Sequence, residues 1–403
     1  MSQVAPAWGW RRPFGGRAAH VEPGSLFQAT TVQACGLYPF VQGSGAPAYG
    51  VPIGRHMLSA ETVSMEPIAW LRAGLVTNPG VFVLGQPGVG KSTITKRLLT
   101  GAAAFGMPAF VPGEPKGEYS ALVAHLGGQV IRVGRGLDRI NPLDSGPLGQ
   151  LARSLSGDAA AQLRAEVRGR RLALLSALCG LVRRTPMTDG EEVALARAAD
   201  LLAERLDVDP TVPDVLRVLE EGPDEMRSAM YADERADYQR QVTPLCWTLR
   251  RLCEGSLGGM FDGPSGVTLD LDRPASVDIS AVTSQGDTAV AAAMFCSWAW
   301  GFSLLDASVA AGGPRRQRLV VLDEMWRALR AAPGLVEHAD QLTRLNRHTG
   351  AATVMVTHSL ADLEALATEE DRAKARGFIE RCGITVLGAP PRRSSTGSRR
   401  WRR

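Results

Sequence analysis

The chain has 403 residues, of which 45% are apolar and 21% charged, a composition typical of a soluble globular protein of about two or three domains. The last fourteen residues hold six arginines and no acid, so the net charge of +4 leaves about −2 on residues 1–389, and no basic footprint for duplex DNA is expected on the body. Six scattered cysteines without a CxxC pair argue against zinc and against a disulfide framework, and fit a reducing cytoplasm.

Residues 1–75 are rich in Gly and Pro and show no sustained periodicity. We expect an irregular N-terminal arm or a reduced N-terminal domain there. The first twenty residues contain arginines but no apolar run after them, so no signal peptide is expected.

Short apolar runs alternate with helical patterns from residue 76 to residue 149. The runs 81–85, 107–112 and 129–133 predict buried strands, and the segments 91–104 and 118–126 predict helices. This alternation predicts an α/β fold with a doubly wound, mainly parallel sheet, and residues 76–149 would form the first part of that core.

Residues 150–255 show helical apolar spacing and no convincing strand, which predicts an inserted all-helical domain that packs as a separate lobe beside the sheet. Thr188 and Glu191 are spaced as a capping box at the start of one of its helices.

Strands return in residues 256–389, the predicted second part of the core. Residues 266–280 alternate around Arg273-Pro274, which predicts a hairpin, and the runs 318–324, 351–358 and 383–389 predict three more buried strands. Residues 289–305 carry no charge, but this run is short for a membrane span and rich in Ala, Gly and Ser, so a buried helix on the sheet is favoured. Residues 390–403 form a basic tail that is either a solvated disordered end or a binder of anionic lipid or nucleic acid.

A phosphate-binding loop follows the first strand. Its pattern GxxxxGK[ST] lies between a predicted strand and a predicted helix, the context that this motif requires. Backbone N–H groups and the positive end of the helix would face the phosphates, with Lys91 on the β- and γ-phosphates and Ser92 on Mg²⁺. The predicted nucleotide-binding residues of the loop are Gly85, Gln86, Pro87, Gly88, Val89, Gly90, Lys91, Ser92 and Thr93.

A second carboxylate site follows the apolar run 319–322, where Asp323 and Glu324 stand together. Asp323 would hold Mg²⁺ through water, and Glu324 would polarise the attacking water as general base. Lys91 and Asp323 are 232 residues apart, more than small GTPases or nucleotide kinases need, so a domain must be inserted between them. The absence of an NKxD guanine reader favours ATP.

Six segments give the chain a more specific resemblance over about residues 75–388. In chain order they read "GQPGVGKSTITKRLL", "PGEPKGEYSALVAHLGGQVIRVG", "INPLD", "GMFDGP", "LDEMWRAL" and "LNRHTGAATVMVTHSLADL". These segments resemble those of the type IV secretion and conjugal transfer ATPases (VirB/TraC type), in the HerA–FtsK group of P-loop NTPases. The resemblance implies a RecA-like core with a helical insert, and a ring-forming, often hexameric motor docked on an inner-membrane channel.

Three positions depart from the family pattern. Glu114 is the acidic residue of the DPxGEY-like segment, Thr357-His358 replaces a threonine–glutamine pair, and Arg347-His348 replaces an Arg-Lys pair. His358 would either sense the γ-phosphate or be a polar residue at a strand end. Trp298, Trp300 and Trp326 are expected in the core.

An arginine from a neighbouring subunit commonly neutralises the γ-phosphoryl charge in ring ATPases. The resemblance makes Arg347 the better candidate for this catalytic finger, with Arg344 as the alternate. The competing interpretation is a surface arginine paired with a helix acid.

The sequence therefore predicts a Mg²⁺-dependent ATPase that forms a ring-shaped homo-oligomer and energises conjugative transfer or type IV secretion. Its expected partners are ATP, further copies of itself and channel proteins at the inner membrane. Its expected place is the cytoplasm, including the inner face of the cell membrane. DNA stays open as a partner. The alternatives are a DNA translocase or coupling protein of the same superfamily, and a slowly hydrolysing nucleotide-binding assembly subunit.

Overall fold

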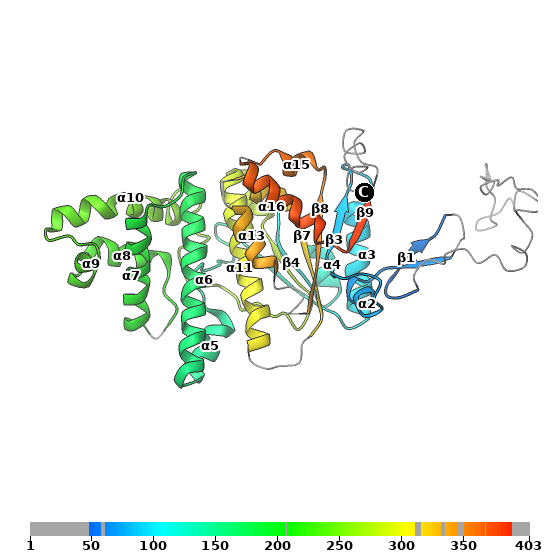
Figure 1. Cartoon of the computed structure of the whole chain (residues 1–403), viewed down its shortest axis with the longest axis horizontal. Helices are drawn as coiled ribbons and strands as arrows, with labels where there is room; N and C mark the ends of the chain where they lie inside the picture. The colour runs from blue at the N-terminus through cyan, green and yellow to red at the C-terminus, as the bar shows by residue number, and fades with distance from the viewer. Residues whose placement is uncertain are drawn as a thin grey trace, which may run out of the picture. The chain divides into compact units, whose positions relative to one another are not determined.

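A computed structural model of the chain describes residues 48–57, 61–206, 208–310, 316–331, 335–344, 350–366 and 368–388 (Figure 1). The chain divides into two compact units, and the first includes Pro52–Ser64. Its described part is an antiparallel pair of strands, β1 (Pro52–Arg55) and β2 (Thr62–Ser64). Most of the N-terminal arm expected from the sequence lies outside the described residues.

The second unit is built on a seven-stranded sheet in which every paired strand is parallel. The strands are β3 (Val81–Leu84), β4 (Ala109–Glu114), β5 (Gln129–Arg132), β6 (Ala275–Asp278), β7 (Arg318–Asp323), β8 (Ala351–Thr357) and β9 (Ile384–Leu387). Every residue of β3, β4, β6, β7 and β8 is buried, as expected of parallel strands covered on both faces. The predicted α/β fold with a parallel sheet is confirmed.

The order of the strands across this sheet is β5-β6-β4-β7-β8-β3-β9. Strand β8 therefore lies between β3, which precedes the phosphate-binding loop, and β7, which carries the acidic pair. Since parallel strands end at the same edge, the residues that follow β3, β8, β7 and β4 meet side by side at the carboxyl edge, where ligands bind in sheets of this kind.

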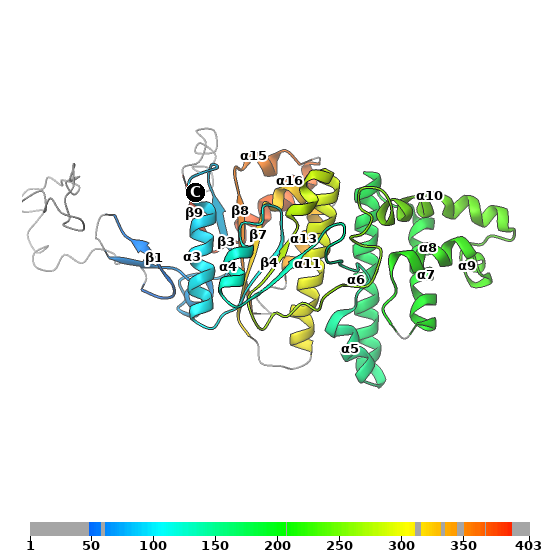
Figure 2. The same ribbon diagram turned by 180° about the vertical axis from the view of Figure 1, so that it is seen from behind.

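Helices cover both faces of the sheet. Figures 1 and 2 show α3 and α4 on one face and α11, α13 and α16 on the other. The helices of this part are α2 (Pro67–Arg72), α3 (Lys91–Ala104), α4 (Ser120–His125), the 3₁₀ helix η1 (Ser280–Gln285), α11 (Asp287–Ala310), α12 (Met325–Leu329), α13 (Leu335–Arg344), α15 (Ala361–Glu364) and α16 (Glu369–Glu380).

Every described element between β5 and β6 is a helix. These are α5 (Gly146–Ser154), α6 (Gly157–Arg183), α7 (Asp189–Arg205), α8 (Val212–Glu221), α9 (Asp224–Ala229) and α10 (Arg235–Cys253). The predicted capping box is present, because Thr188 Oγ1 accepts from Glu191 N and the Glu191 carboxylate accepts from Thr188 N. These helices and the sheet belong to one compact unit, and the boundaries of a separate insert domain stay a prediction.

The prediction of a hairpin at residues 266–280 is wrong. Only β6 is a strand, and it pairs in parallel with β4 and β5. The Gln129 side chain supplies the reason, because its amide donates to Thr268 O at 2.9 Å and its carbonyl accepts from Asp270 N at 3.0 Å. A side chain, rather than a second strand, binds the backbone of Thr268 and Asp270 in the alternating segment before β6.

The apolar run becomes the buried core of α11. Among the described residues, one helix, Asp287–Ala307, is long and apolar enough to cross a membrane, and 78% of that window is buried inside the protein. The helix lies so close to β4 that a Cβ at Gly301 would stand 2.0 Å from the Phe110 ring. The prediction of a buried helix on the sheet is confirmed.

Candidate functional site

The phosphate-binding loop connects β3 to α3. Gly88 and Gly90 have backbone φ angles of 82° and 91°. Residues with a Cβ rarely adopt such values, so glycine lets the loop turn tightly here. Residues 86–90 are exposed, whereas Lys91 is buried. The Lys91 ammonium donates to Gln86 O at 3.0 Å, closing the loop on itself. Burial lowers the Lys91 pKa, and the nearby carboxylates Glu324 and Asp323 oppose this effect.

Asp323 ends β7 and is 7% exposed. Its Oδ2 accepts from the Tyr119 hydroxyl and its Oδ1 from Glu324 N, each at 2.9 Å. Burial raises the pKa of Asp323, although the Tyr119 hydrogen bond opposes the rise. With Ser92 half-buried at the start of α3, these oxygen donors fit a Mg²⁺ ion that keeps several of its waters.

Glu324 follows Asp323 with a φ of 55°, in the left-handed region that a non-glycine residue rarely occupies. The strand ends at this point, and three groups from other residues surround the Glu324 carboxylate. Oε1 is 2.5 Å from Lys116 Nζ and 2.7 Å from His358 Nε2, and Oε2 accepts from Trp326 Nε1 at 2.6 Å. The carboxylate is only 4% exposed.

The pKa of Glu324 reflects these contacts. Burial alone raises the pKa of Glu324, but the hydrogen bond and charge of Lys116 and the charge of His358 outweigh burial and hold it below its usual value. Lys116 keeps a raised pKa although burial lowers it, because Glu324 accepts from its ammonium. These contacts favour the ionised form of the Glu324 carboxylate.

The end of β4 contributes a further acid, Glu114, which is 1% exposed. Its Oε1 accepts from Lys116 N at 2.7 Å, whereas its Oε2 has no hydrogen-bond partner. Burial raises the Glu114 pKa to about 7. Glu114 supports the backbone that carries Lys116 and Tyr119, the two residues that contact Glu324 and Asp323.

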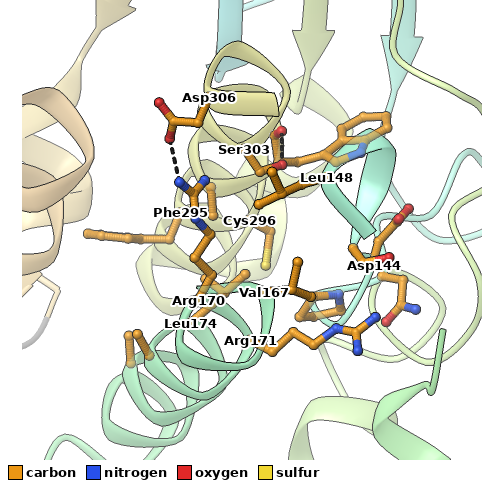
Figure 3. A pocket seen from close by; sticks show the side chains of 17 residues that line it. Asp144, Leu148, Val167, Arg170, Arg171, Leu174, Phe295, Cys296, Ser303 and Asp306 are labelled. Atoms are coloured by element: carbon orange, nitrogen blue, oxygen red, sulfur yellow. Dashed lines mark hydrogen bonds and ion pairs between the residues drawn. The ribbon is translucent and has the colours of Figure 1, made fainter. Parts of the chain in front are cut away.

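A cavity of about 530 Å³ opens beside Glu324. Its lining includes Lys116, Trp326 and His358. A more enclosed cavity of about 210 Å³ lies between α5, α6 and α11, where Arg170 donates to Asp306 at 2.7 Å (Figure 3). The two cavities share no lining residue, so the enclosed one is separate from the loop and the acidic pair.

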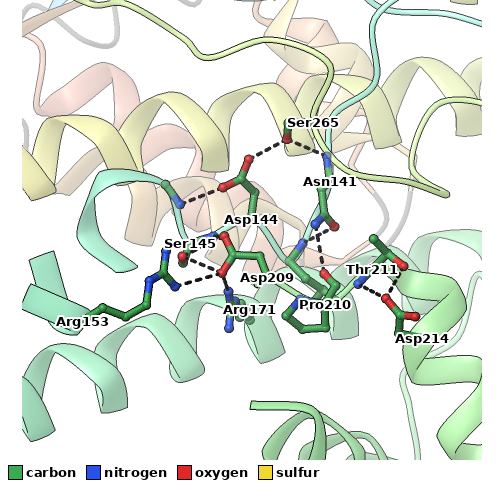
Figure 4. A network of polar contacts seen from close by, with 12 residues as sticks. Asn141, Asp144, Ser145, Arg153, Arg171, Asp209, Pro210, Thr211, Asp214 and Ser265 are labelled. Carbon is green, nitrogen blue, oxygen red and sulfur yellow. Dashed lines mark hydrogen bonds and ion pairs between the residues drawn. The ribbon is translucent and has the colours of Figure 1, made fainter. Parts of the chain in front are cut away.

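A polar network joins the "INPLD" segment to the connection between α7 and α8 (Figure 4). Asn141 donates to Pro210 O at 2.9 Å, and Ser145 donates to the Asp209 carboxylate through both its N–H and its hydroxyl. Arg171 of α6 also pairs with Asp209. Through these contacts the sheet side of the unit is tied to the helices α6, α7 and α8.

The structure brings most of the predicted site residues to one edge of the sheet. The loop with Lys91 and Ser92 follows β3, His358 follows β8, and Asp323 and Glu324 follow β7. Arg347 lies outside the described residues, and for Arg344 the structure gives only its place at the end of α13. Trp298 and Trp300 are buried as expected, whereas half-buried Trp326 contacts Glu324.

Sequence reasoning missed the roles of Lys116, Tyr119 and Trp326. The first two lie in "PGEPKGEY", which was recognised as a specific segment but gave no signal for individual contacts. Lys116 and Glu324 are 208 residues apart, and only the adjacency of β4 and β7 brings them together.

No protein-family model and no curated protein matches the chain. Among solved structures, the chain is similar to VirB4 of Thermoanaerobacter pseudethanolicus, with a TM-score of 0.69 and 21% identity over 88% of this chain and 88% of that one. A weaker likeness is to the plasmid coupling protein TrwB with the ATP analogue ADPNP, with a TM-score of 0.49 and 14% identity over 83% of this chain and 79% of that one. Another is to the unbound coupling protein TrwBΔN70, with a TM-score of 0.46 and 15% identity over 74% of this chain and 66% of that one. The likeness to VirB4 shows a shared fold and confirms the RecA-like P-loop core, whereas scores below 0.5 are too low to show one.

Proposed function

We propose that the chain is a Mg²⁺-dependent ATPase that works as a ring-shaped hexamer and energises a conjugative transfer or type IV secretion machine. The observation that carries the ATPase part is that Lys91, Asp323 and Glu324 lie after the carboxyl ends of β3 and β7, the two strands that flank β8. The fold shared with VirB4 and the six segments that resemble secretion ATPases support the secretion part.

In the proposed reaction Lys91 leaves Gln86 O and binds the β- and γ-phosphates, while the N–H groups of the exposed loop cradle them. Glu324 accepts a proton from water as the water oxygen bonds to the γ-phosphorus. The bond between that phosphorus and the bridging oxygen breaks, and ADP leaves. Mg²⁺, held by Ser92 and by Asp323 through water, would neutralise charge on the β- and γ-oxygens.

The remaining parts of the proposal rest on the sequence. Arg347 would contact the γ-phosphate bound to a neighbouring copy, with Arg344 as the alternate. His358, which follows β8, would contact the γ-phosphate bound to its own copy. Residues 150–255 would form the inserted helical domain. Channel proteins at the inner face of the cell membrane would be the partners.

Two substitutions separate binding from hydrolysis. Lys91→Ala should abolish tight ATP binding, because the loop loses its charge toward the phosphates, whereas Glu324→Gln should bind ATP and hydrolyse it at least about 100-fold more slowly, because an amide cannot take the proton. Equilibrium binding of labelled ATP and phosphate release measure the two effects.

Glu220→Gln is the matched control, since Glu220 lies on the exposed face of α8 and pairs with Arg250. It should leave both measurements unchanged. Hydrolysis by Glu324→Gln at the parent rate would show that another group is the base.

A further inference from the structure

Glu324 has almost no access to water in the arrangement described here. Lys116 and His358 occupy Oε1 and Trp326 binds Oε2, so three of the roughly four lone pairs are used, and the residue is 3% exposed. A general base needs a free lone pair that reaches the proton it takes. Some of these contacts must therefore open before Glu324 can act.

Lys116 is the contact that is able to open. Its side chain is 42% exposed, against 25% for that of His358, and it borders the cavity of about 530 Å³, as the Trp326 and His358 rings also do. A lysine stem has four rotatable bonds and carries a compact charge that can change partners. Space and flexibility are both available to Lys116.

Two ammonium groups at this edge are held by oxygens of the protein itself. Lys91 is bound to Gln86 O, and Lys116 is bound to Glu324. The terminal phosphate of a nucleoside triphosphate carries more charge than either acceptor and would compete for both cations. A diphosphate lacks the group that would reach beyond Lys91.

We propose that Lys116 is a positioning residue that locks Glu324 until the terminal phosphate of bound ATP draws the Lys116 ammonium away. The inference rests on the proposed ATPase function and adds a condition to it. The contact between Lys116 and Glu324 opens only when the bound nucleotide has three phosphates, so it stays closed with ADP.

The indole N–H of Trp326 provides a direct readout, because it donates to the same carboxylate. Its resonance in a ¹⁵N-tryptophan spectrum is assigned with Trp326→Phe. We expect a shift on adding the Mg²⁺ complex of a non-hydrolysable ATP analogue and no shift with Mg²⁺-ADP. In nucleotide-free Lys116→Met, the resonance should already stand near its analogue-bound position and should no longer respond.

Two further variants make the test specific. Lys116→Arg keeps the charge and should restore the response to the analogue, and Lys374→Met removes a lysine from α16, where it pairs with Glu337 and Glu370, and should behave as the parent. Equal shifts with ADP and the analogue, or an unchanged resonance in Lys116→Met, would overturn the lock while the ATPase proposal stands. Failure of the parent to bind either nucleotide would overturn both.

Discussion

At the residue scale, the acidic pair after β7 is held by residues that follow other strands of the sheet. Asp323 accepts from Tyr119, and Glu324 is bound by Lys116 and His358. Glu114 at the end of β4 differs, since one of its oxygens is buried without a hydrogen-bond partner. A buried carboxylate without full compensation is costly to ionise, which is why its pKa is raised to about 7 from 4.5.

This raised pKa predicts a pH-dependent loss of stability. Below pH 4.5 Glu114 is protonated in both folded and unfolded chains and contributes nothing. As pH rises toward 7 the folded state binds more protons than the unfolded state, so stability falls. Above pH 7 the ionised folded form carries the full cost, at most about 3.5 kcal/mol for a shift of this size.

Glu114→Gln removes the charge and keeps an oxygen for Lys116 N. The variant should match the parent in free energy of unfolding near pH 4.5 and exceed it at pH 8, as measured by urea unfolding at both values. A difference that stays constant with pH would show that folding does not shift the pKa of Glu114.

At the scale of elements, the sequence predicted local structure better than it predicted which strands pair with one another. The bounds of α3 and the capping box of α7 follow from residues close together in the chain. The prediction of a hairpin before β6 was wrong, because alternation alone does not show whether a second strand or a side chain such as Gln129 binds the backbone of that segment. The contact of Lys116 with Glu324 depends on the order of strands across the sheet, which no local pattern encodes.

The packing of α11 on β4 gives a test at this scale. Gly301→Ala would place a Cβ 2.0 Å from the Phe110 ring, and such overpacking typically costs ~1–3 kcal/mol. Gly169→Ala in α6 is the control, since a Cβ there meets nothing within 4 Å. It should stabilise the helix by up to about 1 kcal/mol.

Denaturant unfolding of both variants compares them directly. The close approach of α11 to β4 predicts changes of opposite sign. Equal stabilisation by the two alanines would mean that α11 stands farther from the sheet than described.

At the scale of the whole molecule, one copy of the chain contains the proposed base Glu324, the proposed phosphate-binding Lys91 and the proposed Mg²⁺ ligand Asp323. The arginine that would complete this site in the proposed ring, Arg347, was inferred from the match of "LNRHTGAA" alone, and it lies outside the described residues. The proposal therefore requires that neighbouring copies share each site, which makes activity depend on assembly.

Steady-state hydrolysis of Mg²⁺-ATP, measured over a range of protein concentrations, tests this requirement. The parent should hydrolyse ATP with a specific activity that rises with concentration, while Lys91→Ala and Arg347→Ala should each be nearly inactive alone. Mixing the two variants should restore part of the rate, because some interfaces of a mixed ring contain both an intact loop and an intact arginine. The account would be contradicted if the parent hydrolysed ATP no faster than Lys91→Ala at any concentration. It would also be contradicted if the two variants were active alone and their mixture hydrolysed ATP no faster than either.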